Sequence, residues 1–407
     1  MNQNYRRIFL SFTGSFCLAI VLTSLLSCSK KSESRLILNK DYKKEIIEGR
    51  QAFRIYLISS SVPGMSVSVS VDGKTVWSEG IGFASKELQA PAIPETKFRI
   101  GGTSRMLTAF LIARLQQEGK LKVSDSFYKY IPDFPRKQWD FSVSQLGTHS
   151  AGFAGENDEQ LLKSSKEHST LKDYVKAFSN DSLQYRPDSY FILSDYGFCL
   201  LGIMAEEITQ KKFQALMKEM VLDTLGLEET TADNPFYLIN QRAQPYYQNY
   251  IAQLMNAPPV NLGFCAPSKG FLSTADDLNK AGQAILDTTF FSRESLDLFV
   301  TPHKLGDYET NLGFGWWILR DQEGRTFYAQ TGSTIGGSSM LLVYPDTRLV
   351  VSICSNIAEE PGRMPGEQIA NIFLKKLDPQ QTEGKKNPGA TDDAAIPAEA
   401  GQTPENN

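Results

Sequence analysis

The chain has 407 residues, of which 41% are apolar, 11% aromatic and 22% charged. This composition is close to that of average globular proteins, and it excludes a collagen-like, a disordered or a multi-pass membrane chain. The 42 basic and 46 acidic residues give a net charge of −4, and no basic block indicates nucleic-acid binding. Five cysteines are too few for a disulfide framework, and three scattered histidines predict no metal site or cofactor.

Residues 1–27 carry the pattern of an export signal. Arg6 and Arg7 precede an almost wholly apolar run over 8–26, which ends at a small residue and Cys28. A transmembrane anchor is the alternative, because about 19 apolar residues could just span a bilayer. The sequence before Cys28 resembles a bacterial lipoprotein processing site. We therefore expect an exported protein anchored to a membrane by a lipid on Cys28, facing the periplasm or the cell surface.

Both ends of the mature chain differ in composition from its centre. Residues 28–50 are polar and are interpreted as a lipidated tether that leads into the first helix. Residues 378–407 contain no aromatic or β-branched run and are predicted to be disordered. The folded body is expected over 51–377. Its cysteines lie in apolar runs and are interpreted as small core residues: Cys199, Cys265 and Cys354.

The folded body begins and ends with predicted β-hairpins. In the first, valines alternate with serines over 65–71, Asp72-Gly73 favours a type I′ turn, and 74–80 forms the return strand. Apolar periodicity then predicts helices over 104–117, 196–208 and 212–222. The second hairpin is predicted over 338–344 and 348–355, and a helix over 364–377 follows it.

This order of elements predicts an α+β fold. Strands at both ends of the chain surround a helical middle. We expect an antiparallel sheet built from both chain ends, flanked by helices, with an inserted and mostly helical region.

Several short motifs follow one another in a fixed order along the folded body. They include Phe98-Arg99-Ile100-Gly101-Gly102-Thr103-Ser104-Arg105, the stretch 146–152, the stretch 187–202 and Gln330-Thr331-Gly332. Together these segments resemble the serine β-lactamase and penicillin-binding-protein family, nearest to its class C and D-alanyl-D-alanine carboxypeptidase branch. The stretches 76–80 and 337–343 are especially similar to the mitochondrial serine β-lactamase-like branch. The resemblance implies the fold predicted above over 51–377.

The resemblance also implies acyl transfer through a serine ester, which needs a nucleophile, a base and an oxyanion hole. Gly102 and Arg105 occupy the family's serine and lysine positions. Glycine cannot form an ester, and arginine keeps its proton at any working pH. Leu193 and Asp195 stand at the positions of the family's tyrosine and asparagine, and Gln330 replaces the cationic strand residue. The chain is therefore predicted to be an inactive pseudoenzyme that binds or scaffolds peptidoglycan stem peptides or envelope proteins.

An active serine hydrolase with an atypical nucleophile is the alternative function, as a β-lactamase, a D,D-peptidase or an esterase. Ser104 is the first candidate, although it lies about 200° around the helix from Gly102 and is expected to point away from the cleft. Ser150 is the second, although it lacks the first glycine of a nucleophile elbow and is interpreted as a turn residue. We interpret His149 as a structural histidine.

The paired replacements Arg105 and Asp195 lead to a further expectation. The corresponding positions face each other across the cleft in the family, so we predict an Arg105–Asp195 ion pair that fills the former site. The competing interpretation is that Arg105 binds the carboxylate of a peptide ligand. Gln330, Thr331 and Ser333 would then be its polar contacts.

Overall fold

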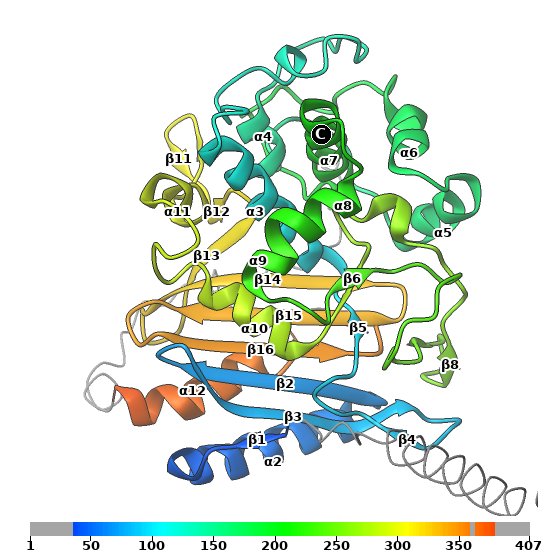
Figure 1. Ribbon diagram of the computed structural model, residues 1–407. Coiled ribbons are helices and arrows are strands. Elements are labelled where there is room, and N and C mark those ends of the chain that lie inside the picture. The colour runs from blue at the N-terminus through cyan, green and yellow to red at the C-terminus, as the bar shows by residue number, and fades with distance from the viewer. Residues whose placement is uncertain (1–35, 359–362, 379–407) are drawn as a thin grey trace, which may run out of the picture. The chain divides into compact units, whose positions relative to one another are not determined.

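The computed structural model describes residues 36–358 and 363–378 (Figure 1). The predicted export signal, Cys28 and the predicted tail over 379–407 lie outside these ranges. Among the helices of the described ranges, none is both long and apolar enough to cross a membrane.

A nine-stranded antiparallel sheet forms the lower part of the molecule in Figure 1. Its strand order is β1-β3-β2-β16-β15-β14-β13-β12, and β4 pairs with β3 at the edge. The N-terminal strands join the C-terminal strands where β2 pairs with β16, which confirms the predicted sheet built from both chain ends. The strands are β1 (Ile37–Leu38), β2 (Gly64–Val71), β3 (Lys74–Ser85), β4 (Ala90–Pro91), β12 (Leu312–Gly313), β13 (Trp316–Arg320), β14 (Thr326–Thr334), β15 (Gly337–Tyr344) and β16 (Leu349–Ser355).

Both predicted hairpins are present in the sheet. Asp72 and Gly73 between β2 and β3 have φ angles of +48° and +75°. Positive φ at both central residues is what a type I′ turn requires. The second hairpin joins β15 to β16, and its last cross-strand pair is Tyr344 with Leu349.

Helices cover both faces of the sheet (Figure 1). One face packs against α2 (Lys43–Ser59) and α12 (Gly366–Leu377), where Trp77 of β3 contacts the rings of Phe53 and Phe373. The other face packs against α10 (Ala275–Gln283) and the helical region. Because both faces are covered, every residue of β2 is buried, the serines as well as the valines.

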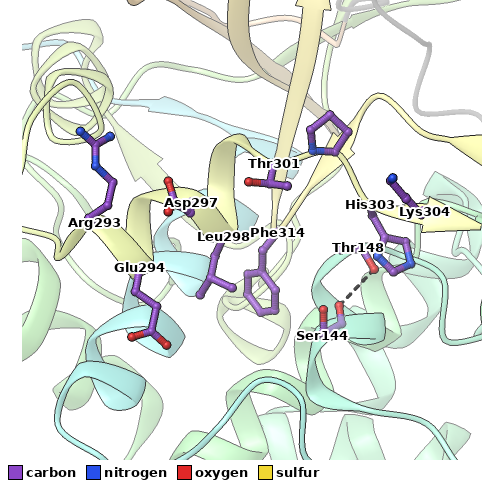
Figure 2. A pocket seen from close by; sticks show the side chains of 11 residues that line it. Ser144, Thr148, Arg293, Glu294, Asp297, Leu298, Thr301, His303, Lys304 and Phe314 are labelled. Carbon is purple, nitrogen blue, oxygen red and sulfur yellow. Dashed lines mark hydrogen bonds between the residues drawn. The ribbon is translucent and has the colours of Figure 1, made fainter.

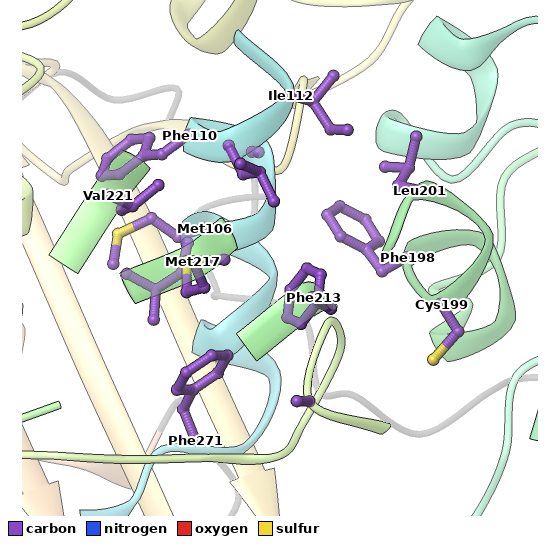
Figure 3. Packing of buried hydrophobic residues seen from close by; sticks show 14 of the residues in the cluster. Met106, Phe110, Ile112, Phe198, Cys199, Leu201, Phe213, Met217, Val221 and Phe271 are labelled. Carbon is purple, nitrogen blue, oxygen red and sulfur yellow. The ribbon is translucent and has the colours of Figure 1, made fainter. Parts of the chain in front are cut away.

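The inserted region is mostly helical, as predicted, and α3 (Ser104–Gln117) runs through its core (Figure 3). The helix packs against α7 and α8, and its Phe110 contacts the rings of Phe291, Phe299 and Trp316. The three cysteines of the described ranges are buried and free. The predicted helix over 212–222 is interrupted, because its second half is a π-helical turn. The other elements are α4 (Val143–Gly147), α5 (Asp158–Glu167), α6 (Leu171–Phe178), α7 (Asp195–Thr209), α8 (Phe213–Met217), the π turn Lys218–Leu222, α9 (Asp223–Leu225) and α11 (Arg293–Val300).

Three small sheets complete the described fold. The first joins β5 (Phe98–Arg99) and β6 (Thr231–Ala232) to β9 (Phe271–Ser273), and it leads directly into α3. The other two are the hairpins β7 (Tyr246–Gln248) with β8 (Leu254–Asn256), and β10 (Lys304–Leu305) with β11 (Tyr308–Glu309).

Candidate functional site

The start of α3 lies directly against β14. A 3₁₀ turn, Gly101–Thr103, precedes the helix, and Gly101 has a φ angle of +51°. A Cβ atom on Gly101 would lie 2.6 Å from the backbone of Ser333, and one on Gly332 would overlap the carbonyl oxygen of Ile100. Only glycine fits where two backbones approach so closely. These two glycines place Gly102 beside the Gln330–Ser333 segment of β14.

The N-terminus of α7 provides the second wall of the site. Ser194 is the N-cap residue, and its Oγ accepts a hydrogen bond from the backbone N–H of Gly197 at 3.3 Å. Its own N–H donates to Nδ1 of His149 at 3.0 Å. These contacts fix Asp195 as the first residue of α7, with its side chain buried.

Arg105, Asp195 and Lys269 form a buried ion cluster in the site. Arg105 Nη1 lies 3.4 Å from Asp195 Oδ1, and Lys269 Nζ lies 2.9 Å from Asp195 Oδ2. The exposed fractions of the three side chains lie between 5% and 9%. The predicted Arg105–Asp195 ion pair is confirmed. The contribution of Lys269 was not predicted, because nothing in the sequence around this lysine indicates that it is buried.

Two residues of the site bear directly on its chemistry. Gly102, which the resemblance assigns to the family's serine position, presents no side-chain atom, and the guanidinium of Arg105 cannot accept a proton at working pH. Two cations and one carboxylate leave one positive charge over, and the carboxylates of Glu156 and Asp158 also interact electrostatically with Lys269. Burial of the two cations is favourable only with such carboxylates nearby.

The β14 residues proposed as ligand contacts differ in their surroundings. Gln330 is buried, and its side-chain amide donates a hydrogen bond to the carbonyl oxygen of Gly315. Thr331 is buried, whereas Ser333 is half-buried. One N–H of Gln330 is therefore engaged within the protein. A ligand-binding role for these three residues stays a prediction.

Ser104 faces away from β14. Its Oγ accepts a hydrogen bond from the backbone N–H of Phe271 in β9 at 3.2 Å, and the residue is fully buried. This orientation agrees with the helical geometry expected from the sequence. The hydroxyl helps join α3 to the small sheet β5-β9-β6.

Ser150 belongs to a second polar cluster, around Asp188. Asp188 Oδ1 accepts a hydrogen bond from Ser150 Oγ at 2.7 Å and lies 2.8 Å from His303 Nε2, while Oδ2 accepts one from Gln145 at 2.6 Å. Burial alone would raise the pKa of Asp188, but the hydrogen bonds from His303, Ser150 and Gln145 outweigh it and lower the pKa. Asp188 thus holds α4, the 148–150 loop and the start of β10 together.

The Asp188 cluster is not arranged as a catalytic triad. In a triad, one imidazole nitrogen faces the carboxylate and the other faces the serine. Here the same Nε2 atom of His303 faces the carboxylate and lies 3.1 Å from Ser150 Oγ. A ring nitrogen that donates to a carboxylate cannot also accept the serine proton. A pocket of about 640 Å³ borders His303 and Thr148, but Ser150 does not line it (Figure 2).

His149 is a structural histidine in this geometry. Its backbone adopts a φ angle of +58°, its ring packs on Phe198, and Nδ1 accepts the N–H of Ser194. Burial, together with the nearby positive charge of Arg105, holds the pKa of His149 well below its ordinary value. The imidazole is therefore neutral in the folded protein.

We expect stability to decline in acid because of His149. The unfolded chain takes up a proton at this residue below about pH 6.5 whereas the folded protein does not, so the free energy of unfolding should fall by about 1.4 kcal/mol between pH 7.5 and 5.5. In His149→Asn this component should be absent, since Asn tolerates positive φ and its Oδ1 can accept the same hydrogen bond. Urea unfolding of both chains at the two pH values measures the difference, and equal losses would contradict a neutral His149.

Within 36–358 and 363–378, no group of three or more His, Cys, Asp and Glu side chains is placed to hold a metal ion. Burial raises the pKa of each of the three cysteine thiols of these ranges. A thiol with a raised pKa is a poor nucleophile and a poor metal ligand at neutral pH.

Comparisons with known proteins agree with this fold. The β-lactamase family model matches residues 44–372. The mitochondrial serine β-lactamase-like protein LACTB of Homo sapiens is 26% identical over 378 residues, covering 70% of this chain and 69% of that protein. FmtA from Staphylococcus aureus superposes with a TM-score of 0.70 at 20% identity, covering 89% of this chain and 97% of that one. A class C β-lactamase mutant superposes with a TM-score of 0.69 at 21% identity, covering 83% and 99%. Because the family model spans most of the described residues, the chain belongs to the β-lactamase family.

Proposed function

We propose that this chain is a non-acylating member of its family, with a binding or scaffolding role in the cell envelope. The observation that carries the proposal is the ion cluster beside Gly102. It pairs Arg105 and Lys269 with Asp195, and the resemblance assigns Arg105 and Asp195 to the family's lysine and asparagine positions. Ser104 and Ser150, the alternative nucleophiles, are both fully buried and hydrogen-bonded within the protein.

The size of the expected loss supports a role without catalysis. In a well-studied serine protease, removal of the nucleophile alone lowers turnover by about 10⁶-fold. Residual acceleration from an oxyanion hole would remain small on that scale. A chain that keeps the fold while losing both nucleophile and base is suited to binding.

The proposed location and ligands follow from the N-terminus and the cleft. Export and lipidation at Cys28 would place the folded body at the envelope, within reach of peptidoglycan stem peptides and envelope proteins. A ligand that carries a carboxylate, such as the C-terminus of a stem peptide, would share Arg105 or Lys269 with Asp195. Ser333 on β14 is half-buried, and its hydroxyl would be a polar contact for such a ligand.

Covalent labelling tests the absence of acyl transfer. The full chain is incubated with a fluorescent β-lactam and with a fluorophosphonate, and an active class C β-lactamase is treated in parallel. We expect no adduct in the intact mass of this chain, since Gly102 has no hydroxyl group and Ser104 and Ser150 are buried and hydrogen-bonded within the protein. A stoichiometric adduct on any side chain would overturn the proposal in favour of an active hydrolase.

Ligand-dependent stabilisation tests the binding role in the same preparation. A peptide ending in D-Ala-D-Ala should raise the Tm of the chain in proportion to its occupancy. The matched control is the same peptide with an amidated C-terminus, which lacks the carboxylate and should raise Tm less. Equal Tm values with and without the peptide would leave envelope proteins as the ligands of this role.

A further inference from the structure

Several large apolar side chains are exposed at one end of the central sheet. Three are almost fully accessible to solvent: Ile58 at 81%, Leu88 at 80% and Tyr250 at 98%. Monomeric proteins rarely expose such side chains together without an interaction to account for them. We call the group the apolar end surface, and its members are Ile55 and Ile58 of α2, Leu88 of the β3–β4 turn, and Tyr247, Tyr250, Ile251 and Met255 of the β7–β8 hairpin.

Hydrogen bonds hold the three elements of this surface together. The side chain of Gln248 in β7 donates to the carbonyl oxygen of Ser60, at the C-terminal end of α2, at 2.8 Å. The hydroxyl of Tyr246 in β7 accepts the backbone N–H of Lys86, two residues before Leu88, at 2.8 Å. The surface is therefore one region of the fold, although its parts are far apart in the sequence.

The tip of the β7–β8 hairpin is an ordered turn. The side-chain oxygen of Asn249 accepts the backbone N–H of Ile251 at 3.2 Å and that of Gln253 at 2.9 Å. Behind the tip, Tyr247 pairs with Met255 across the strands, and both are exposed. These hydrogen bonds hold the turn in one conformation, in which the side chains of Tyr250 and Ile251 face solvent.

The described chain begins near the same end of the sheet. β1 pairs antiparallel with β3, with Ile37 opposite Ser78. Leu36 therefore lies at the end of β1 that is nearer the later residues of β3 and the β3–β4 turn, which carries Leu88. Leu36 follows Cys28 by eight positions, a stretch that reaches at most about 29 Å when fully extended. A lipid on Cys28 would hold this end of the sheet close to the bilayer.

We propose that the apolar end surface docks on the lipid bilayer that holds the N-terminal lipid. Tyrosine is the residue expected at the level of the lipid headgroups, with aliphatic side chains below it. Arg54, Lys86 and Glu87 are exposed beside the apolar side chains, and the two cations among them match anionic headgroups. This docking proposal rests on the membrane location proposed above. It does not depend on whether the chain can carry out acyl transfer.

Tryptophan quenching tests the docking with the full chain. Tyr250→Trp is compared with Tyr308→Trp, an exposed tyrosine on the β10–β11 hairpin, which lies on the opposite side of Figure 1 from β8. Both variants are mixed with vesicles of phosphatidylethanolamine and phosphatidylglycerol that contain brominated lipid. We expect the fluorescence added at position 250 to be quenched by the brominated lipid and that added at 308 to be unaffected. Equal quenching at both positions would overturn the proposal.

Transfer between vesicles gives a second measure of the same contact. Replacing both Tyr250 and Ile251 by serine should raise the rate of transfer from donor to acceptor vesicles at least about 10-fold, because two large apolar side chains no longer partition into the membrane. Tyr308→Ser should leave the rate unchanged. An unchanged rate in the double variant would count against docking.

Two further measurements distinguish bilayer docking from self-association and from the lipid anchor. Crosslinks between copies of the chain through position 250, with no quenching by lipid, would assign the apolar end surface to self-association and overturn bilayer docking. The mass of the mature N-terminus reports lipidation of Cys28 independently. A mature chain without the lipid would refute the proposed anchor. Quenching at position 250 shows in either case whether the apolar end surface contacts the bilayer.

Discussion

Asp195→Asn should lower the free energy of unfolding by about 3–5 kcal/mol. Asp195 is the carboxylate shared by Arg105 and Lys269 in the ion cluster, and all three side chains are buried. Removing the negative charge leaves both cations in a region of low dielectric constant, where each loses an attraction that offset its desolvation. Urea unfolding at pH 7.5, followed by circular dichroism, measures the loss.

The same substitution at an exposed ion pair provides the control for Asp195→Asn. Asp223 pairs with Lys218 on the surface, and Asp223→Asn is expected to cost no more than about 1 kcal/mol. A further test places Asp195→Asn in a Lys269→Met background. In that background only Arg105 still pairs with Asp195, so the loss in the free energy of unfolding should be smaller. The double-mutant cycle gives the coupling energy between Asp195 and Lys269. If Asp195→Asn costs no more than Asp223→Asn, the ion cluster does not stabilise the fold.

Much of the sheet could be predicted from local sequence. The alternation of valine and serine over 65–71, followed by Asp72-Gly73, fixes a hairpin through side-chain period and turn chemistry alone. The pairing of β2 with β16 is different, because it joins residues almost 300 positions apart and no local signal encodes it. The sequence predicts only that hairpins at both chain ends share one sheet, since each needs partners, and it does not name the strands that pair.

One contact of the site could be predicted from the sequence, because the two replacement residues carry opposite charges. Arg105 and Asp195 were expected to pair because a buried arginine needs a carboxylate, and the structure contains that pair. Lys269 gave no such signal, since a lysine next to Gly270 is typical of an exposed turn. The Asp188 cluster was missed for a related reason: Ser150 and His303 lie in different loops, and only the tertiary fold brings them to one carboxylate.

Family membership and chemistry rest on different residues of this chain. The family model matches residues 44–372, which include the sheet strands from β2 to β16, α3 and the close backbone contact at Gly332. Acyl transfer depends on a few side chains grafted onto that fold. The chain can therefore keep the fold of an enzyme family while Gly102 and Arg105 occupy the positions on which its reaction depends.

Gly332→Ala tests the backbone contact that the site depends on. A methyl group at this position would overlap the carbonyl oxygen of Ile100 and lie 2.5 Å from the backbone nitrogen of Thr103. Both are main-chain atoms at the start of α3, so no side-chain rotation can relieve the overlap, and we expect a loss of about 3 kcal/mol in the free energy of unfolding. Urea unfolding measures this loss.

The control for Gly332→Ala separates overlap from backbone strain. Gly119, after the end of α3, has a φ angle of +69°, and a Cβ atom added there would meet no heavy atom within 4 Å. Gly119→Ala therefore adds only conformational strain, worth about 1–2 kcal/mol. Gly332→Ala should exceed it, because its cost comes from pushing α3 away from β14. Equal losses in the two variants would mean that the start of α3 can move off the strand freely, and the position of Arg105 beside Asp195 would then need another explanation.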